Sequence, residues 1–297
     1  MFAILGATGK VGGATVAALR RAGAPVRAVV RDRSRAERLA ALGCEIAVAD
    51  LLDAAALAQA IDGASAVQIL CPVSARGTDA PAEMRRSIEA VAEALEAVAA
   101  PRVLALSDYG AQLSAGTGVT GLFHSLEQRL RRSSSRLIFL RSAEHMENWS
   151  RVVPVAAETG VLASLHHPLT KLFPTVSAFD VGAVAADLLM APANDPISPQ
   201  IVHVEGPRRY APVDVAAAMR SLLGREVVAR ELPRSEWDAA LRRGGLSESY
   251  ARLVVELYEA HNAGWIDAES SVGEIRRGPT ELAEALRPLT LSASGGM

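Results

Sequence analysis

This chain of 297 residues has few cysteines, little net charge and no long apolar run. The two cysteines, Cys44 and Cys71, are too few for a disulfide framework or a metal cage, so we expect buried thiols and no metal site. No apolar segment approaches the roughly eighteen residues that span a membrane, and no basic leader precedes the first apolar stretch. A net charge of -2 without a basic block argues against direct nucleic-acid binding. These absences predict a soluble, cytoplasmic protein that binds neither membrane nor nucleic acid.

A glycine-rich segment directly follows the apolar run 2–5 and precedes the helix-forming stretch 14–22. Glycines let the chain turn sharply between a strand and a helix and approach a pyrophosphate closely, while free amides at the helix start donate hydrogen bonds to its oxygens. A simple tight turn would also use glycines, but the strand-turn-helix context favours cofactor binding. The residues expected to hold the pyrophosphate are Gly6, Ala7, Thr8, Gly9, Lys10, Val11 and Gly12.

The residue after the second predicted strand, 25–30, indicates which dinucleotide binds. Arg31 stands there, and a guanidinium can clamp a 2′-phosphate through paired hydrogen bonds, with Arg33 and Arg35 adding positive charge. A carboxylate at this point would instead accept hydrogen bonds from the ribose hydroxyls of NAD, and Asp32 could take that role. The sequence therefore favours NADP(H) over NAD(H).

Strand and helix patterns alternate through the first half of the chain, and six strands precede residue 141. This alternation predicts an α/β fold with a doubly wound parallel sheet, the Rossmann arrangement. A seventh strand is expected at 201–205, so that 173–206 returns to the first domain. The predicted parts are an NADP-binding domain at 1–157, a smaller, mainly helical domain covering the substrate at 207–290, and a disordered tail at 291–297.

Several residues follow these strands at the sheet edge where open α/β sheets place their ligands. Asp50, with Leu51 beside it, follows the third strand and is expected either to meet the adenosine or to cap the helix 54–61. Cys71 and Pro72 follow the fourth strand and should run alongside the dinucleotide. The residues after the fifth strand, which should border the nicotinamide, are Ser107, Asp108 and Tyr109.

A common catalytic pair is missing from the chain. Many reductases use a tyrosine with a lysine four positions later, which lowers the pKa of the phenol and anchors the nicotinamide ribose. The chain has two lysines, Lys10 and Lys171. Neither follows a tyrosine at that spacing, because the residues four positions beyond the tyrosines are Leu113, Asp214, Val254 and Asn262.

Hydride transfer does not require that pair. A quinone or azo compound is electron-poor enough to take hydride from NADPH while a proton comes from water or a loosely placed donor. The candidate donors are Tyr109 at the end of the fifth strand, His124 near the start of the next helix and His145 just past the sixth strand. Each could also be a hydrogen-bonded structural side chain, and this alternative stays open.

Six segments resemble one protein family over residues 1–290. They are GATGKVG, VVRDRSRA, HSLEQRL, FLRSAEHMENW, AFDVGAVAADLL and HVEGPRRYAPVDVAAAMRSLLGR. Together they resemble the NmrA-like branch of the atypical short-chain dehydrogenase/reductases, and within it the NAD(P)H-dependent azoreductases and quinone-reductase-like proteins. The resemblance implies that residues 6–12 hold the pyrophosphate and Arg31 the adenosine phosphate. It also implies that the inner half of the cofactor meets Leu70, Cys71, Pro72 and Ser107.

The same resemblance implies a substrate side formed by residues Met146 to Asn148. Tyr109, which follows the fifth strand, is also expected to contact the substrate. Ser142 replaces a proline that is frequent in the family. Two hypotheses follow: an NADPH-dependent oxidoreductase acting on a small electron-poor substrate, or a redox sensor that binds the nucleotide and a protein partner. The apolar, aromatic-bearing helix 253–265 favours an enclosed pocket and therefore the enzyme. A homodimer is also expected.

Overall fold

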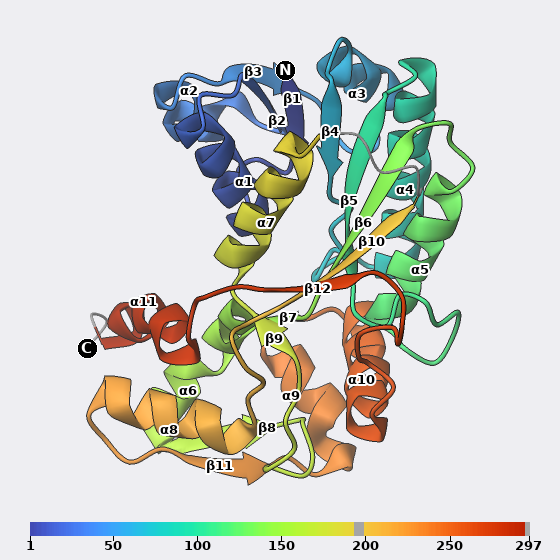
Figure 1. Cartoon of the computed structure of the whole chain (residues 1–297). Coiled ribbons are helices and arrows are strands. Elements are labelled where there is room, and N and C mark those ends of the chain that lie inside the picture. The colour runs from blue at the N-terminus through green and yellow to red at the C-terminus, as the bar shows by residue number, and fades with distance from the viewer. Residues whose placement is uncertain (193–198, 295–297) are drawn as a thin grey trace.

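An eight-stranded parallel sheet forms the centre of the computed structural model, which describes residues 1–192 and 199–294 (Figure 1). The strand order is β12-β10-β6-β5-β4-β1-β2-β3. This order confirms the predicted doubly wound α/β fold, and its reversal between β1 and β4 marks the crevice that such sheets use for ligands. The strands are β1 (Phe2–Leu5), β2 (Val26–Val30), β3 (Glu45–Val48), β4 (Ala66–Ile69), β5 (Arg102–Asp108), β6 (Arg136–Ser142), β10 (Gln200–Glu205) and β12 (Glu274–Arg277).

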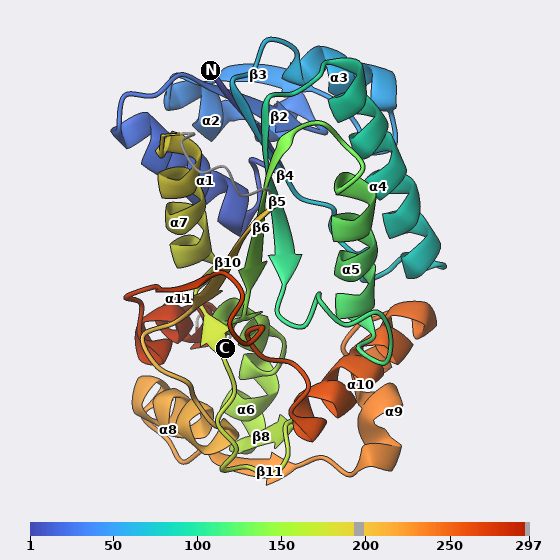
Figure 2. The same cartoon turned by 45° about the vertical axis from the view of Figure 1, so that its right-hand side comes forward.

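Alternating side chains of the strands supply two cores, one on each face of the sheet. Ile4 of β1 packs on the face covered by α1, α2 and α7, whereas its neighbours Ala3 and Leu5 pack on the face covered by α3, α4 and α5. Figure 2 shows α1 and α7 on one side of the sheet and α4 and α5 on the other. These helices are α1 (Lys10–Arg21), α2 (Glu37–Ala41), α3 (Ala54–Ile61), α4 (Ala80–Ala97), α5 (Val119–Leu130) and α7 (Ala178–Met190).

A second lobe lies beyond the carboxyl ends of the strands (Figure 1). Its core contains Met146, Trp149, Phe173, Tyr210 and Leu286, so the predicted domain boundary at residue 157 falls inside this lobe. Two parallel strand pairs, β7 with β9 and β8 with β11, belong to it. Its elements are β7 (Glu144–His145), η2 (Met146–Arg151), α6 (Val153–Thr159), β8 (Val161–Ser164), β9 (Thr175–Val176), α8 (Pro212–Leu223), β11 (Val228–Glu231), α9 (Trp237–Arg243), α10 (Glu248–Ala263) and α11 (Leu282–Ser294).

The chain returns to the main sheet through β12, so the segment 207–290 is not the continuous separate domain that the sequence predicts. Ile275 of β12 pairs with His203 of β10. No alternating pattern marks β12 because it is an edge strand whose side chains are mostly charged and exposed. The helix α11 then extends to Ser294, past the predicted start of the tail at 291, and residues 295–297 lie outside the described part.

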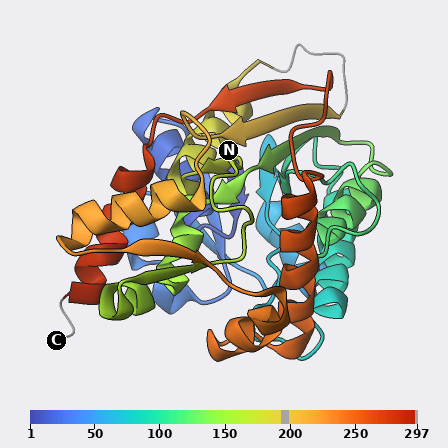
Figure 3. The same cartoon turned by 90° about the horizontal axis from the view of Figure 1, so that it is seen from below.

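Helix α10 connects the second lobe to the sheet. It packs against α5 and α4, and Figure 3 shows it beside α5 on the side of the lobe away from α8 and α11. Val254 of α10 and Val119 of α5 share one buried cluster, and the amide of Ser247 donates to the carbonyl of Ala75 at 2.9 Å. Helix α10 therefore covers the loop after β4 and the start of α5.

Candidate active site

The glycine-rich loop has the conformation that a pyrophosphate requires. Gly6 has a φ of +69°, and a Cβ on Gly12 would overlap the carbonyl oxygen of Gly6. Gly9 precedes α1 and no side chain caps this helix, so its first amides lack an intrahelical partner. Thr8 and Lys10 are exposed beside them. This cradle, which a side chain would fill, fits an anionic pyrophosphate. Two predicted members have buried side chains and can offer only their backbone, namely Ala7 and Val11.

Arg31 and Asp32 follow β2 and differ in what they are free to bind. The carboxylate of Asp32 accepts a hydrogen bond from the amide of Ser34 at 2.9 Å and caps the short helix η1 (Arg33–Arg35). Hydrogen bonding from Ser34 holds the pKa of Asp32 below its usual value. Arg31, like Arg33 and Arg35 of η1, is exposed. The carboxylate of Asp32 is thus engaged within its own turn, whereas Arg31 is exposed and stays a prediction for the 2′-phosphate.

Asp50 is exposed after β3 and does not cap α3. Its carboxylate accepts from the amide of Leu52 at 2.9 Å, whereas Asp53 caps the helix by accepting from the amide of Ala56. The capping alternative for Asp50 is therefore wrong, because the turn between β3 and α3 places the cap three residues later. Leu51 is half-buried beside it. Asp50 and Leu51 stay predictions for the adenosine side.

The residues after β4 divide between the rim and the core. Leu70 is half-buried and lies against the glycine loop, since a Cβ on Gly6 would come 3.2 Å from its Cδ2. Pro72 is exposed. Cys71 is fully buried, and burial raises the pKa of its thiol to about 12. The cysteine side chain therefore points away from any ligand, and Leu70 and Pro72 are the side chains that can border one.

Ser107 is buried, and its hydroxyl belongs to a network of ion pairs instead of lying on an exposed cofactor-binding surface. Its hydroxyl donates to Oε1 of Glu127 at 2.6 Å. Glu127 in turn pairs through both oxygens with Arg141, at 2.9 and 2.8 Å, and Arg141 also reaches Glu269 at 2.6 Å. Burial by itself lowers the pKa of the Arg141 guanidinium. The carboxylates of Glu127 and Glu269 outweigh this effect and hold the pKa above its usual value. This network locks the ends of β5 and β6 together, a contact that the sequence analysis missed because its members are far apart in the chain.

Tyr109 lies in the core and does not face the site, contrary to its predicted catalytic and substrate roles. Its side chain is 1% exposed, and its ring meets that of His203 edge-on at 5.3 Å. The hydroxyl has no hydrogen-bond partner among the described residues, and burial raises the pKa of the phenol. Strand alternation explains the difference, because neighbouring residues at the end of β5 point to opposite faces of the sheet.

The two candidate histidines are half-buried and already hydrogen-bonded. Nδ1 of His124 lies 2.9 Å from the carbonyl oxygen of Ala111. Nε2 of His145 lies 3.2 Å from the hydroxyl of Ser142. Burial lowers the pKa of His145, the carboxylates of Glu147 and Glu144 oppose this effect, and the charge of Lys10 on α1 adds to it. His145 therefore lies near both the glycine loop and the second lobe.

The predicted substrate segment also divides between core and surface. Met146 is fully buried in the core of the second lobe, so its predicted contact with substrate is wrong. Asn148 is exposed and stays a candidate. Glu147 between them is buried, where it accepts from the hydroxyl of Ser177 at 2.8 Å and the amide of Ala178 at 3.0 Å. The motif thus anchors the start of α7.

Asp108, which was expected to border the nicotinamide but was given no role, has an unusual pKa. Asp108 ends β5, is half-buried, and its Oδ2 accepts a hydrogen bond from Oγ1 of Thr120 at 2.6 Å. Burial raises the pKa of Asp108 to about 7, the neighbouring Glu144 adds to the rise, and the hydrogen bond from Thr120 opposes it. The sequence does not predict the raised pKa of Asp108, because the burial of this residue depends on how α5 and β7 pack around the end of β5.

Glu144 holds α10 against the end of the sheet. Its Oε1 accepts from the hydroxyl of Tyr258 at 3.0 Å, and its Oε2 lies 2.9 Å from Nε2 of His166. Burial by itself raises the pKa of the Glu144 carboxyl group. His166 and Tyr258 outweigh this effect and lower the pKa to about 2. Asp108 and Glu144 are therefore neighbouring carboxyl groups whose pKa values lie far apart. In enzymes, such a difference allows one carboxyl group to act as an acid while its neighbour stays ionised.

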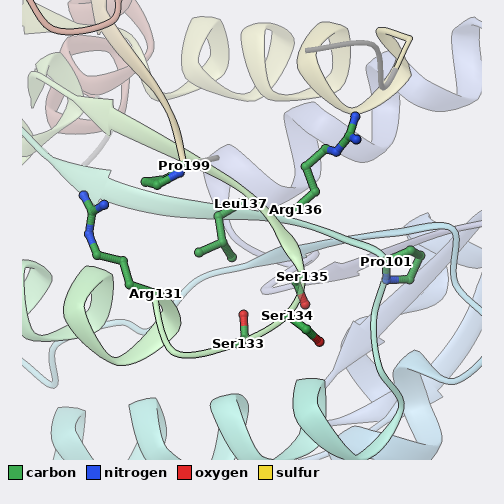
Figure 4. Close-up of a pocket in the computed structure, with 8 residues that line it drawn as sticks. All are labelled: Pro101, Arg131, Ser133, Ser134, Ser135, Arg136, Leu137 and Pro199. Atoms are coloured by element: carbon green, nitrogen blue, oxygen red, sulfur yellow. The ribbon is translucent and has the colours of Figure 1, made fainter. Parts of the chain in front are cut away.

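Other sites are less suitable. A hollow of about 730 Å³ lies at the amino ends of β5 and β6, at the opposite end of the sheet from the glycine loop. Figure 4 shows the residues that line it, namely Pro101, Arg131, Ser133, Ser134, Ser135, Arg136, Leu137 and Pro199. Within residues 1–192 and 199–294, no three His, Cys, Asp or Glu side chains gather where a metal ion could be held. In the described part of the chain, no helix combines the length and apolar character needed to cross a membrane.

Residues 6–152 match the family model described as NAD(P)H-binding. NAD(P)H azoreductase of Xenophilus azovorans is 26% identical over 259 residues, which cover 87% of this chain and 86% of that protein. Quinone oxidoreductase 2 of Escherichia coli (strain K12) is 27% identical over 296 residues, covering 97% and 98%. A crystal structure of an NADPH-dependent quinone oxidoreductase from Escherichia coli has a TM-score of 0.79 at 23% identity, over 97% of this chain and 99% of that one. These matches confirm the resemblance inferred from the sequence motifs.

Proposed function

Residues 6–152 of this chain match the NAD(P)H-binding family model, and on this basis we propose that the protein is an NADPH-dependent oxidoreductase. Its acceptor is a small, electron-poor molecule: a quinone, an azo compound or an activated carbonyl compound. The observation that carries the proposal is the glycine cradle at the carboxyl rim of the sheet, the edge beyond which the second lobe lies. The similarity to quinone and azo reductases over both lobes supports the acceptor class. The homodimer stays a prediction.

The residues of the loop and rim would bind and orient the nucleotide. The amides at the start of α1 hold the pyrophosphate, and Arg31 pairs with the 2′-phosphate through charge-assisted hydrogen bonds. Once bound, NADPH supplies the hydride. Apolar side chains of α10 and the loop after β4, among them Leu253, Leu257 and Val73, then offer a water-poor wall for the acceptor.

An electron-poor acceptor fits the absence of a tyrosine-lysine pair. Lys171 is in the second lobe, where its ammonium donates to the carbonyls of His261 and Asn262 at 2.8 and 2.7 Å. Lys10 belongs to the glycine loop. Neither lysine can therefore lower the pKa of a tyrosine at the end of β5, and the acceptor must accept hydride without that assistance.

Wild-type protein mixed with NADPH and a panel of quinones, azo dyes and activated carbonyl compounds is expected to oxidise NADPH. The measurement is the loss of NADPH absorbance, with product analysis to show reduction of the acceptor and a control without protein. If NADPH binds tightly but stays unoxidised with every acceptor, the sensor hypothesis stands in place of the enzyme. A pull-down with NADP⁺ and with NADPH would then look for a nucleotide-dependent protein partner.

Arg31→Glu is expected to weaken NADPH binding about 100-fold and NADH binding less than about threefold, because only NADPH carries the 2′-phosphate. The dissociation constants are measured by fluorescence titration. Arg38→Glu is the matched control, since it makes the same charge change on α2 at another exposed arginine. Equal losses for both nucleotides, or an equal effect of Arg38→Glu, would contradict a specific phosphate contact.

A further inference from the structure

We propose that Asp108 is the proton donor of this enzyme, delivering a proton to the acceptor as the hydride arrives. The proposal rests on the proposed function and names a catalytic residue for it. Asp108 was not among the candidate donors of the sequence, whereas Tyr109, His124 and His145 were.

The position of Asp108 suits a group that meets the reacting end of the dinucleotide. It is the last residue of β5 and lies opposite Ser142, the last residue of β6. In doubly wound sheets the ligand lies outside the carboxyl ends of the strands, and the inner half of the dinucleotide follows from the switch point toward these two strands. The side chain is half-buried, so it is reachable from the rim. Thr120 of α5 holds one carboxyl oxygen at 2.6 Å and orients the other.

The surroundings of Asp108 favour its protonated form at neutral pH. Burial raises the pKa of Asp108 to about 7, the hydrogen bond from Thr120 opposes this rise, and the anionic Glu144 of β7 adds to it. Tyr250 of α10 lies near the carboxyl group of Asp108. Burial raises the pKa of the Tyr250 phenol, Arg151 of η2 opposes this rise, and Asp108 adds to it. An acid with a pKa near the working pH is both protonated often enough and acidic enough to transfer a proton.

The other titratable groups near the rim are less suited to this task. Glu144 is held as an anion by His166 and Tyr258, so it carries no proton to give. Burial lowers the pKa of His145, although Glu147 and Glu144 oppose this effect, and its Nε2 already contacts the hydroxyl of Ser142. The phenol of Tyr109 is buried in the core. Asp108 is therefore the acid for which position, access and protonation state agree.

In the proposed step, the acceptor gains a hydride at one atom of its carbonyl, quinoid or azo system. The O–H bond of the Asp108 carboxyl group breaks, and its proton forms a new bond to the oxygen or nitrogen atom that receives the electron pair. The products are the reduced acceptor, NADP⁺ and the Asp108 carboxylate. Water then returns a proton to the carboxylate through its exposed side.

The test is the pH dependence of kcat/KM for Asp108→Asn, which keeps the shape of the side chain and can still accept from Thr120. Wild-type activity is expected to fall as the pH rises through about 7, because the protonated acid is lost. The variant should be slower by about 100- to 1000-fold at low pH and should lack this inflection. Its NADPH dissociation constant should change less than about twofold. Asp187→Asn, at an exposed site on α7, is the control and should behave like wild type.

A second measurement does not depend on turnover. Infrared difference spectra of the wild-type protein across pH should contain a protonated carboxyl band that titrates near pH 7, and this band should be missing from Asp108→Asn. Titration of that carboxyl group below about pH 5, or an unchanged pH profile in a folded Asp108→Asn, would overturn the proposal. Failure of the wild type to oxidise NADPH with any acceptor would instead defeat the proposed function, so the two failures are distinguishable.

Discussion

Gly12→Ala is expected to raise the dissociation constant of NADPH at least about 100-fold, a loss of about 2.7 kcal/mol of binding free energy. The new Cβ would overlap the carbonyl oxygen of Gly6 and lie 2.8 Å from its carbonyl carbon. Both atoms belong to the backbone of the loop, so the loop must move, and the amides that face the pyrophosphate move with it. Isothermal titration calorimetry measures the affinity and thermal unfolding measures the integrity of the fold.

Gly13→Ala is the matched control because the same helix receives the same extra methyl group one residue later. There the Cβ would lie 3.4 Å from the carbonyl oxygen of Ala7, which is an ordinary contact. Alanine is favoured over glycine within a helix by up to about 1 kcal/mol, so this variant should unfold no earlier than wild type and should bind NADPH normally. If Gly12→Ala binds as tightly as Gly13→Ala, the cradle is not the pyrophosphate site.

Arg141→Met is expected to lower the free energy of unfolding by about 3–5 kcal/mol. Arg141 is 2% exposed, and its removal leaves the buried carboxylate of Glu127 without its bidentate partner. A buried anion that loses its bidentate partner is costly because water cannot solvate it, and methionine restores only part of the packing. The hydroxyl of Ser107 at 2.6 Å and the guanidinium of Arg131 at 3.8 Å remain as weaker partners of Glu127. Urea unfolding followed by circular dichroism measures the change.

Arg129→Met provides the comparison for a surface ion pair. Arg129 also contacts two carboxylates, Glu89 and Glu96, but these are 58% and 43% exposed. Water solvates them when the arginine is lost, so the expected change is below about 1 kcal/mol. A second substitution, Glu127→Gln, placed in Arg141→Met should restore part of the lost stability, since it removes the stranded charge. Equal destabilisation by Arg141→Met and Arg129→Met would show that burial does not govern this network.

The parts of the site that the sequence predicts are those built from neighbouring residues. The turn from Gly6 to Gly12 depends on backbone freedom and on a strand and a helix that adjoin it, and all of these are read within one short segment. The exposed guanidinium of Arg31 likewise follows from its place after a buried strand. Asp50 shows the limit of such local inference, because the choice between two aspartates three residues apart depends on the exact geometry of the turn.

Long-range packing decided which face each rim residue presents and what charge it carries. Tyr109 and Asp108 are neighbours in the sequence, yet the first is enclosed by the core and the second borders the rim, because the strand end alternates between two environments. The proton affinity of Asp108 depends on Glu144 and on burial beneath α5 and α10. β12 joined the sheet without an apolar pattern, because the partner strand β10 supplies its hydrogen bonds.

The sequence by itself therefore determined the alternating α/β architecture, the nucleotide cradle and the absence of a tyrosine-lysine pair. These properties follow from residue type and short-range spacing, which fix backbone freedom and periodicity. The tertiary structure alone decided that the second lobe begins at the end of β6, that Ser107 serves the Glu127–Arg141 network, and that the pKa of Asp108 is raised to about 7. Desolvation and ion pairing depend on groups brought together from distant parts of the chain, and no local pattern encodes them.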